Sequence, residues 1–466
     1  MGTGPTDANL IHRPVCPVLA SNIGVLNDHA WLLPRRDVFD GQLGTITRPN
    51  PVLIGMPTPA HSSPQKEPHL ALTPTERRAS FSLAGLFATR MLGLFLLLPV
   101  FAVAATGLKG GQDPASVGLA LGIYGLTQAF MQIPFGMVSD RLGRRPVVLF
   151  GLILFLIGSV VCALADDIFW VTIGRAIQGS GAISAAVTAW LADATRAEVR
   201  TRAMALIGAS IGLSFAVSLV LAPVMVGWTS LSGLFWLIAG LGTAAFFIAA
   251  FVVPDAPLPV KAATTPNARA VLGHKSLLRL NFGVFCLHLS QVALFVVVPP
   301  LLVQLGGLSA QTLWYAYLPI LFVSFLFMVP IIFVTEKRRC HIQTLKWAVV
   351  GLVAVASGFA LSAQSWWPLV ACLTGFFIVF NVLEALQPSL VSRVAPPALK
   401  GLALGVYNTS QALGLFLGGV VGGWLLQTAG ATGVFWAIAA LCVVWLLTTW
   451  RLNEADGMSN TATPAT

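Results

Sequence analysis

The sequence predicts an all-α membrane protein with twelve transmembrane helices in two six-helix halves. Of its 466 residues, 56% are hydrophobic and only 9% are charged, whereas a soluble domain usually has about 25% charged residues. The mean hydropathy is +0.83. Apolar stretches of about 20 residues, long enough for a helix to cross the bilayer core, recur from residue 79 to residue 452. Lipid must therefore solvate most of the chain, which excludes soluble enzymes, nucleic-acid-binding proteins and secreted scaffolds.

Residues 1–72 are predicted to form a disordered cytoplasmic tail. The first 74 residues contain eleven of the 29 prolines, and no apolar run among them reaches the length of a span. Met56 is an alternative start of translation, so the sequence leaves open whether residues 1–55 are made. The first helix is expected to begin at Thr73-Pro74-Thr75-Glu76, which has a capping residue, a proline in the first turn and a glutamate three residues after the cap.

Twelve apolar runs then follow in order, and they are far longer than the 9–11 residues of a membrane β-strand. The N-terminal half, residues 73–253, contains the spans 79–105, 115–138, 146–165, 168–192, 203–227 and 232–253. Residues 254–277, the longest internal connector, are the predicted cytoplasmic linker. The C-terminal half, residues 278–452, contains the spans 278–303, 310–334, 343–363, 366–392, 399–427 and 431–452, and residues 453–466 are a short cytoplasmic tail.

The basic residues predict the orientation of these spans. The connectors after the even-numbered spans contain thirteen Lys and Arg residues, and the connectors on the other face contain only Lys109. Since cytoplasmic loops carry the excess of Lys and Arg, both termini are expected in the cytoplasm. This asymmetry also explains the net charge of +10 without an acidic partner, and we expect no nucleic-acid binding.

An internal repeat supports the two halves. The eight residues from Pro134 to Arg141 match those from Pro330 to Lys337, 196 positions later, and five of the eight positions are identical or conservative. Both octads close an even-numbered span. The halves are therefore expected to share one architecture.

Four charged or titratable residues lie inside spans, where a charge costs about 2.5–3.5 kcal/mol. They are Arg90, Arg175, His288 and Glu384, on spans one, four, seven and ten. These spans are the first of each three-helix set, so we expect the four residues to face one central cavity. The other predicted cavity residues are Tyr124, Gln128, Gln178, Gln291, Asn381, Gln387, Tyr407 and Gln411.

Structural roles remain open for most of these residues. Buried amides often serve only as hydrogen bonds between helices, Arg90 and Arg175 can pair with carbonyl groups, and His288 can be a packing histidine. Glu384 is the strongest functional candidate, because a lone carboxylate in mid-span must either pair with a cation or carry a proton.

The connector after span two carries a specific motif. Its defining residues are Gly136, Asp140, Arg141, Gly143, Arg144 and Arg145. They match the loop signature G-x-x-x-D-[RK]-x-G-[RK]-[RK] at every defining position, so the chain resembles the major facilitator superfamily. That resemblance implies two six-helix halves that work by alternating access.

Further segments are similar to the same superfamily. The run from Arg175 to Gly179 resembles its fourth-helix motif, whose arginine is associated with proton coupling. Gly208–Gly212 and Ala222–Gly227 resemble the antiporter motif of its drug-export branch, with Ala222 and Val226 where glycines are usual. Residues 73–452 resemble the YajR-like transporters of that superfamily. This resemblance implies that Asp140, Arg144 and Asp193 form a charge cluster that latches the outward-open state.

Together these features predict a secondary transporter of the bacterial inner membrane that exports a small, partly lipophilic compound in exchange for protons. Glu384 is expected to carry the proton, and Arg90 and Arg175 are expected to set the electrostatics of the cavity. The two arginines also permit a symporter or uniporter for an organic anion. A membrane receptor or assembly partner without transport is a third possibility.

No enzyme motif contradicts this assignment. The chain has no G-x-x-x-x-G-K-[ST] and no H-E-x-x-H, and its G-x-S-x-G at Gly208–Gly212 lies inside a span. Its six cysteines are isolated, which supports neither disulfides nor a metal site. We expect no enzymatic activity, no metal and no cofactor, with the proton gradient as the driving force. The expected partners are a small-molecule substrate, protons and the lipid bilayer, and we expect a monomer.

Overall fold

The computed structural model describes residues 71–255, 271–362, 365–396 and 399–452. The predicted tails, except residues 71–72, and most of the predicted linker lie outside these residues. The described chain consists of α-helices with short 3-10 and π segments, and within it the only β pairing is an isolated bridge between Lys109 and Asp167. The prediction of an all-α fold is confirmed.

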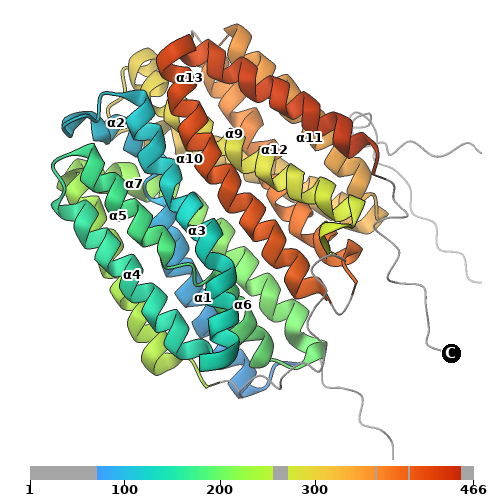
Figure 1. Ribbon diagram of the computed structural model, residues 1–466. Coiled ribbons are helices and arrows are strands. Elements are labelled where there is room, and N and C mark those ends of the chain that lie inside the picture. The colour runs from blue at the N-terminus through green and yellow to red at the C-terminus, as the bar shows by residue number, and fades with distance from the viewer. Residues whose placement is uncertain (1–70, 256–270, 363–364, 397–398, 453–466) are drawn as a thin grey trace, which may run out of the picture. The chain divides into compact units, whose positions relative to one another are not determined.

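The first part of the chain forms seven α-helices and two short turns of other helix types. These are α1 (Pro74–Phe95), α2 (Phe101–Ala104), η1 (Ala105–Gly107), α3 (Pro114–Leu142), α4 (Arg144–Leu164), α5 (Ile168–Ser180), α6 (Ser184–Asp193), α7 (Ala197–Phe247) and η2 (Ile248–Val252). The second part forms α9 (Lys275–Gly306), α10 (Trp314–Arg338), α11 (His341–Ser362), α12 (Trp366–Val394) and α13 (Lys400–Trp450). Figure 1 follows them along the chain.

Every predicted span falls on one or more of these helices, and eight helices in the described chain are long and apolar enough to cross a membrane. Two of the eight contain a backbone break where the sequence predicts a boundary between spans. The break in α7 is at Ser230, with φ 75°, and the break in α13 is at Gly430, with φ 69°. Twelve separate crossings stay a prediction, because α1 and the α5–α6 pair are not among the eight.

Local sequence explains where helices begin. The Thr73 side chain accepts a hydrogen bond from the backbone of Glu76, and the Glu76 carboxylate accepts one from the backbone of Thr73, so the predicted capping box is present. Asp113 caps α3 and Asp167 caps α5 in the same way, through side-chain oxygens that accept backbone N–H groups. Gly143 separates α3 from α4 with φ 92°, a conformation that favours glycine.

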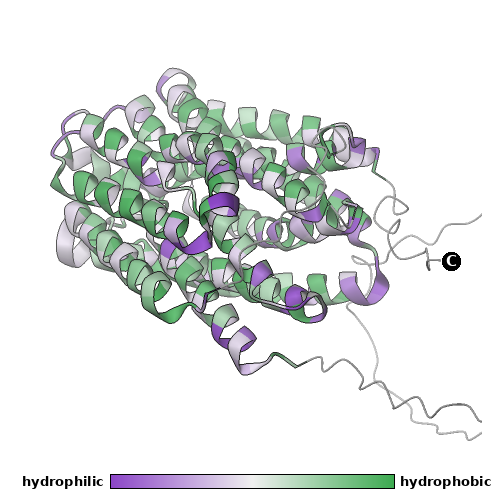
Figure 2. Cartoon of the chain, turned by 60° about the horizontal axis from the view of Figure 1, so that its bottom comes forward, coloured by the Kyte–Doolittle hydropathy of each residue, from purple (hydrophilic) through white to green (hydrophobic). Residues whose placement is uncertain are grey.

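The outer faces of the helices are apolar, as a lipid-exposed surface requires. Phe322, Phe327 and Phe333 on α10 are 70%, 54% and 68% exposed. Hydrophobic residues predominate along the helices, and hydrophilic residues gather near several helix ends (Figure 2). An exposed row of large apolar side chains is unfavourable in water and favourable in lipid.

Glycines bring α13 into close contact with two helices. A Cβ atom added at Gly419 would clash with the backbone of Gly118 and Gly122 on α3, so the two backbones touch. On another face of α13, a Cβ atom added at Gly418 would clash with the backbone of Leu289 on α9. The first segment of α13 therefore packs between α3 and α9 (Figure 1), as small residues allow in membrane helices.

The predicted fourth span is not one continuous helix. It is broken between α5 and α6, at residues 181–183. Gly181 lies against Gly151 of α4 so closely that a Cβ atom would clash with the Gly151 carbonyl. The break leaves carbonyl groups without partners inside the helix, so other residues must supply donors there.

Candidate substrate and proton site

Arg90 supplies donors at the break between α5 and α6. Its side chain is completely buried. Nη1 donates to Ser184 Oγ at 3.0 Å, and Nη2 donates to the hydroxyl of Tyr124 at 2.7 Å and to the carbonyl of Gly181 at 3.4 Å. Arg90 on α1 therefore joins the broken helix to α3.

Arg175 belongs to the same cluster. Its Nη1 donates to Gln178 Oε1 at 2.9 Å, and its guanidinium centre lies 4.8 Å from the centroid of the Tyr124 ring. The Gln178 amide in turn donates to Ser159 Oγ at 2.8 Å. Arg90 and Arg175 thus share Tyr124, and in the described chain neither forms an ion pair with a carboxylate.

His288 is the centre of a second cluster, on α9. Its Nδ1 lies 3.0 Å from the carbonyl oxygen of Val284, and its Nε2 lies 2.7 Å from the amide nitrogen of Gln411. A carbonyl oxygen can only accept, so Nδ1 carries the hydrogen and Nε2 accepts from the Gln411 amide. Both ring nitrogens therefore have partners, as expected of a packing histidine.

Glu384 on α12 completes the second cluster. Its Oε2 lies 3.5 Å from His288 Nε2, and its side chain is 33% exposed, whereas that of His288 is 5% exposed. Oε2 is buried and has no hydrogen-bond partner. The Tyr407 phenol, on α13, interacts electrostatically with Glu384, and its hydroxyl group also has no partner. A histidine and a phenol are therefore polar neighbours of this carboxylate.

The structure brings eight of the twelve predicted cavity residues into these two clusters. The first contains Arg90, Tyr124, Arg175 and Gln178, and the second contains His288, Glu384, Tyr407 and Gln411. Asn381 instead donates to Ser324 Oγ at 3.1 Å, and Gln128, Gln291 and Gln387 are buried without a hydrogen bond to either cluster. No hydrogen bond or ion pair joins the two clusters in the described chain, so a shared cavity stays a prediction.

A cluster of phenylalanines lies beside the second polar cluster and was not predicted. The Phe215 ring on α7 lies 5.2 Å from Phe95 on α1 and 5.7 Å from Phe380 on α12, between ring centroids. It also contacts Phe295 and Phe377, at 6.4 and 6.0 Å. The His288 ring lies 6.0 Å from Phe380. Sequence offered only a weak signal, the phenylalanine-rich run at 376–380.

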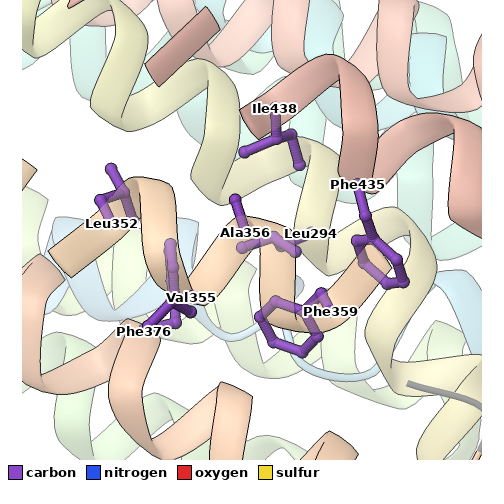
Figure 3. A pocket seen from close by; sticks show the side chains of 8 residues that line it. All are labelled: Leu294, Leu352, Val355, Ala356, Phe359, Phe376, Phe435 and Ile438. Atoms are coloured by element: carbon purple, nitrogen blue, oxygen red, sulfur yellow. The ribbon is translucent and has the colours of Figure 1, made fainter. Parts of the chain in front are cut away.

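An apolar pocket lies between α9, α11, α12 and the second segment of α13 (Figure 3). Its lining residues are Leu294, Leu352, Val355, Ala356, Phe359, Phe376, Phe435 and Ile438. None of the predicted cavity residues is among them, and the lining offers no hydrogen-bonding side chain. We attribute this pocket to packing among the helices.

The predicted latch residues meet at the junction of α3, α4 and α6. Arg144 Nε donates to Asp193 Oδ2 at 2.9 Å, and Arg144 Nη1 contacts Asp140 and donates to Ser139 Oγ at 2.8 Å. Arg144 is 9% exposed, Asp193 26% and Asp140 60%. Gly136 is half-buried in α3, and Arg141 is exposed. All hydrogen bonds of this cluster lie among α3, α4 and α6.

Arg145 has a separate role that the sequence did not reveal. Its Nη2 donates to the carbonyl of Val253 at 2.6 Å and lies 3.1 Å from Asp255 Oδ1. Trp190, whose ring lies below the Arg145 guanidinium, donates to the carbonyl of Pro254 at 3.1 Å. Arg145 and Trp190 thus donate hydrogen bonds to the carbonyl groups of the two residues that follow η2.

Glu336 is the residue equivalent to Asp140 in the internal repeat, and it is the acidic centre of a second charge cluster. Glu336 lies 3.1 Å from His341 Nε2 and 3.2 Å from Arg393 Nη2. Burial raises the pKa of the Glu336 carboxyl, but His341 and Arg393 outweigh it and hold the pKa below its ordinary value. An acid is thus central in one half, where an arginine is central in the other.

Glu76 makes an ion pair that only tertiary structure could reveal. Arg196, which precedes α7, donates from Nε to Glu76 Oε1 at 2.8 Å and from Nη2 to Oε2 at 3.1 Å. Its backbone N–H also donates to Oε1, at 3.0 Å. These hydrogen bonds hold the pKa of the Glu76 carboxyl well below its usual range. The pair ties the start of α1 to the start of α7.

Comparison with known proteins identifies the family. The model of the Major Facilitator Superfamily matches residues 83–419 and 345–464. The chain is 43% identical over 394 residues to the inner membrane transport protein YajR of Escherichia coli K12, covering 84% of this chain and 86% of that protein. It is 25% identical to the class B tetracycline resistance protein of Escherichia coli, over 76% of this chain and 91% of that protein.

Solved structures agree in fold. The human organic anion transporter MFSD10 superposes with a TM-score of 0.61 at 21% identity, covering 81% of this chain and 100% of that one. A D-xylose–proton symporter superposes with a TM-score of 0.65 at 17% identity, covering 81% and 98%. These structural similarities show the fold alone. The family match and the relative at 43% identity identify the chain as a transporter of the major facilitator superfamily.

Proposed function

We propose that this transporter exports a small molecule in exchange for protons, by alternating access between residues 73–253 and residues 278–452. The observation that carries the proposal is the contact between His288 Nε2 and Glu384 Oε2, 3.5 Å apart inside the predicted spans. A carboxylate beside a neutral imidazole is a pair of groups that can take up and release one proton.

The local geometry directs a proton to the face that His288 and Glu384 share. The hydrogen on His288 Nδ1 is held by the Val284 carbonyl, so a second proton would go to Nε2, where it would replace the hydrogen bond from the Gln411 amide and face Glu384. Glu384 Oε2 has no hydrogen-bond partner that competes for it. Movement of one proton through a potential of 100 mV supplies about 2.3 kcal/mol, enough for a substrate gradient of more than tenfold.

Arg90 and Arg175 are proposed to act indirectly. They are fixed positive charges in the N-terminal half, held by Tyr124, Gln178 and the break between α5 and α6. Fixed positive charge on one half attracts a carboxylate that approaches it on the other half. The two arginines would thus set the electrostatics of the cavity around Glu384 when the halves come together.

The export direction and the location rest on the relatives. One relative is named an inner membrane transport protein, and others are named for multidrug and tetracycline resistance. We therefore propose a bacterial inner-membrane exporter with both termini in the cytoplasm, as the basic connectors predict. Asp140, Arg144 and Asp193 would latch one of its states. We propose a monomer that needs no cofactor.

One observation favours a second function, symport or uniport of an organic anion. Arg90 and Arg175 lie in the same buried cluster, and in the described chain neither forms an ion pair with a carboxylate. An anionic substrate would compensate their charge.

Inverted membrane vesicles loaded with a pH-sensitive dye separate the two functions. After the vesicles are energised, a chemically mixed panel of compounds is added. Antiport predicts that a compound restores the dye signal only when this protein is present. Uptake of an anion down its own gradient, with no recovery of the dye signal for any compound, would favour the second function.

A further inference from the structure

Polar atoms without partners are concentrated in one region of the described chain. Among the described residues, 14 buried side-chain nitrogen and oxygen atoms have no hydrogen-bond partner, and eight of them belong to six residues on α3, α9, α12 and α13. These residues are Gln128, Gln132, Asn281, Glu384, Gln387 and Tyr407. A buried polar atom without a partner costs about 1–3 kcal/mol, so such a concentration calls for an explanation.

The packing of α3 on α13 places the glutamines of α3 beside the second polar cluster. Gly118, Gly122 and Gly125 of α3 lie against successively earlier residues of α13, with Gly125 at Ala412. The two helices are therefore antiparallel. If the same pairing continues for one and two turns of α3 beyond Gly125, Gln128 lies at the level of Gln411 and Gln132 at the level of Tyr407.

The other residues lie within about two turns of this level. Gln387 is one turn beyond Glu384 on α12, and Glu384 interacts with Tyr407. Asn281 is two turns before His288 on α9, which packs along the first segment of α13 with Phe285 against Gly414. The phenylalanine cluster lies on the opposite side, since Phe380 is one turn before Glu384 and Phe295 is two turns after His288. We call the six residues the amide layer.

The unpartnered atoms have a chemical bias. Five are acceptors, namely Gln128 Oε1, Gln132 Oε1, Asn281 Oδ1, Glu384 Oε2 and Gln387 Oε1. Two are donors, the amide nitrogens of Gln132 and Gln387, and the Tyr407 hydroxyl can act as either. Rotating the amides of Gln132 and Gln387 does not change this count, because both polar atoms of each are unpartnered. Rotating those of Gln128 and Asn281 would replace two of the acceptors with donors, so a hydroxyl group, which can both donate and accept, fits the site in either orientation.

We propose that the amide layer binds the hydrogen-bond-donating part of the substrate, a hydroxyl- and amine-rich group. Such a group supplies the hydrogen-bond donors that the five acceptors lack. A site built from buried amides discriminates strongly against compounds that have no such donors. All residues of the amide layer except Glu384 are buried in this structure, so we expect the group to enter when the two halves separate. The inference rests on the proposed transport function and narrows its substrate class.

Ligand binding to the purified full-length protein in lipid nanodiscs tests the proposal without any proton movement. The probes are glucosamine, sorbitol and kanamycin, each beside a counterpart whose hydroxyls are methylated and whose amines, where present, are quaternised, so that it keeps the ether oxygens as acceptors and has no O–H or N–H donor. At least one unmethylated probe is expected to raise Tm in a concentration-dependent manner, and its methylated counterpart is expected to have no effect. The proposal is overturned if no probe raises Tm, in which case the amide layer only binds water, or if the methylated probe works equally well.

Gln132→Met and Gln387→Met locate the site. Both should fold, because an apolar side chain of similar size removes buried unpartnered atoms, and both should raise the half-saturating concentration at least about tenfold. Gln427→Met, at an exposed position of α13, is the control and should bind like the wild type. Unchanged binding by both buried variants contradicts the proposal.

The dye assay in inverted vesicles then distinguishes the inference from the proposed function. Proton release driven by tetraphenylphosphonium, without Tm shifts by any donor-rich probe, supports antiport and overturns the amide layer. Donor-rich probes that bind but never move protons support the amide layer and contradict antiport.

Discussion

Arg144 Nε donates a hydrogen bond to Asp193 Oδ2 at 2.9 Å, which ties the start of α4 to the end of α6. The Arg144 side chain is 9% exposed, so its charge needs this partner. Asp193→Asn is expected to reduce the transport rate at least about tenfold, and Arg144→Lys should do the same, because an ammonium cannot replace the guanidinium fork. Both are measured by transport in vesicles matched for protein content. Full activity of both variants would remove the charge cluster from the mechanism.

Asp140 is expected to behave differently from Asp193. It is 60% exposed, so its contact with Arg144 contributes little to stability. Asp140→Asn should therefore leave expression and Tm unchanged while it weakens the latch and slows transport several-fold. Tm and transport are measured on the same preparation. A well-expressed variant with full activity would show that Asp140 has no part in the latch.

The ion pair of Glu76 and Arg196 predicts a pH dependence of stability. Because the pKa of Glu76 is lower in the folded protein than its ordinary value of about 4.3, the pair stabilises the fold fully above that ordinary value. This stabilisation is lost as the pH falls through the lower, folded pKa. Tm should therefore decrease as the pH is lowered below about 5. Glu76→Gln should have a lower Tm at pH 7 and a smaller decrease in acid. Identical pH profiles for the two proteins would contradict this role.

The contact between α3 and α13 makes a steric prediction. Gly419→Leu cannot be accommodated against the backbone of Gly118 and Gly122. It should therefore keep the two helices apart and reduce transport at least about tenfold. Gly405→Leu, on the same helix, is the matched control, because a Cβ atom there meets nothing within 4 Å. Equal activity of the two variants would show that the close contact is not needed for transport.

Much of the fold could be predicted from hydropathy and local motifs. The capping box at Thr73 and Glu76 is present, and the backbone breaks at Ser230 and Gly430 fall where the sequence separates two spans. Such features depend on residues close together in the chain. The break between α5 and α6 was missed, because it depends on the contact of Gly181 with Gly151 on another helix.

The site was predicted less completely than the fold. The sequence identified four charged or titratable residues inside spans, where such residues are unfavourable: Arg90, Arg175, His288 and Glu384. It did not identify the residues that they contact. It placed them around one cavity, which stays a prediction, but it did not show that their contacts form two clusters, around Tyr124 and around His288. These partners lie on other helices, and helix packing decides them. The interaction of Glu76 with Arg196, 120 residues away, was missed for the same reason.

The most direct test of proton coupling compares Glu384→Gln with the wild type in two assays on the same reconstituted vesicles. One assay measures the exchange of labelled for unlabelled substrate, and the other measures proton movement driven by substrate. Because glutamine keeps the shape of glutamate but cannot ionise, the account predicts that exchange persists while substrate-driven proton movement falls at least about tenfold. Proton movement at the wild-type rate in Glu384→Gln would contradict the proposal that Glu384 carries the proton.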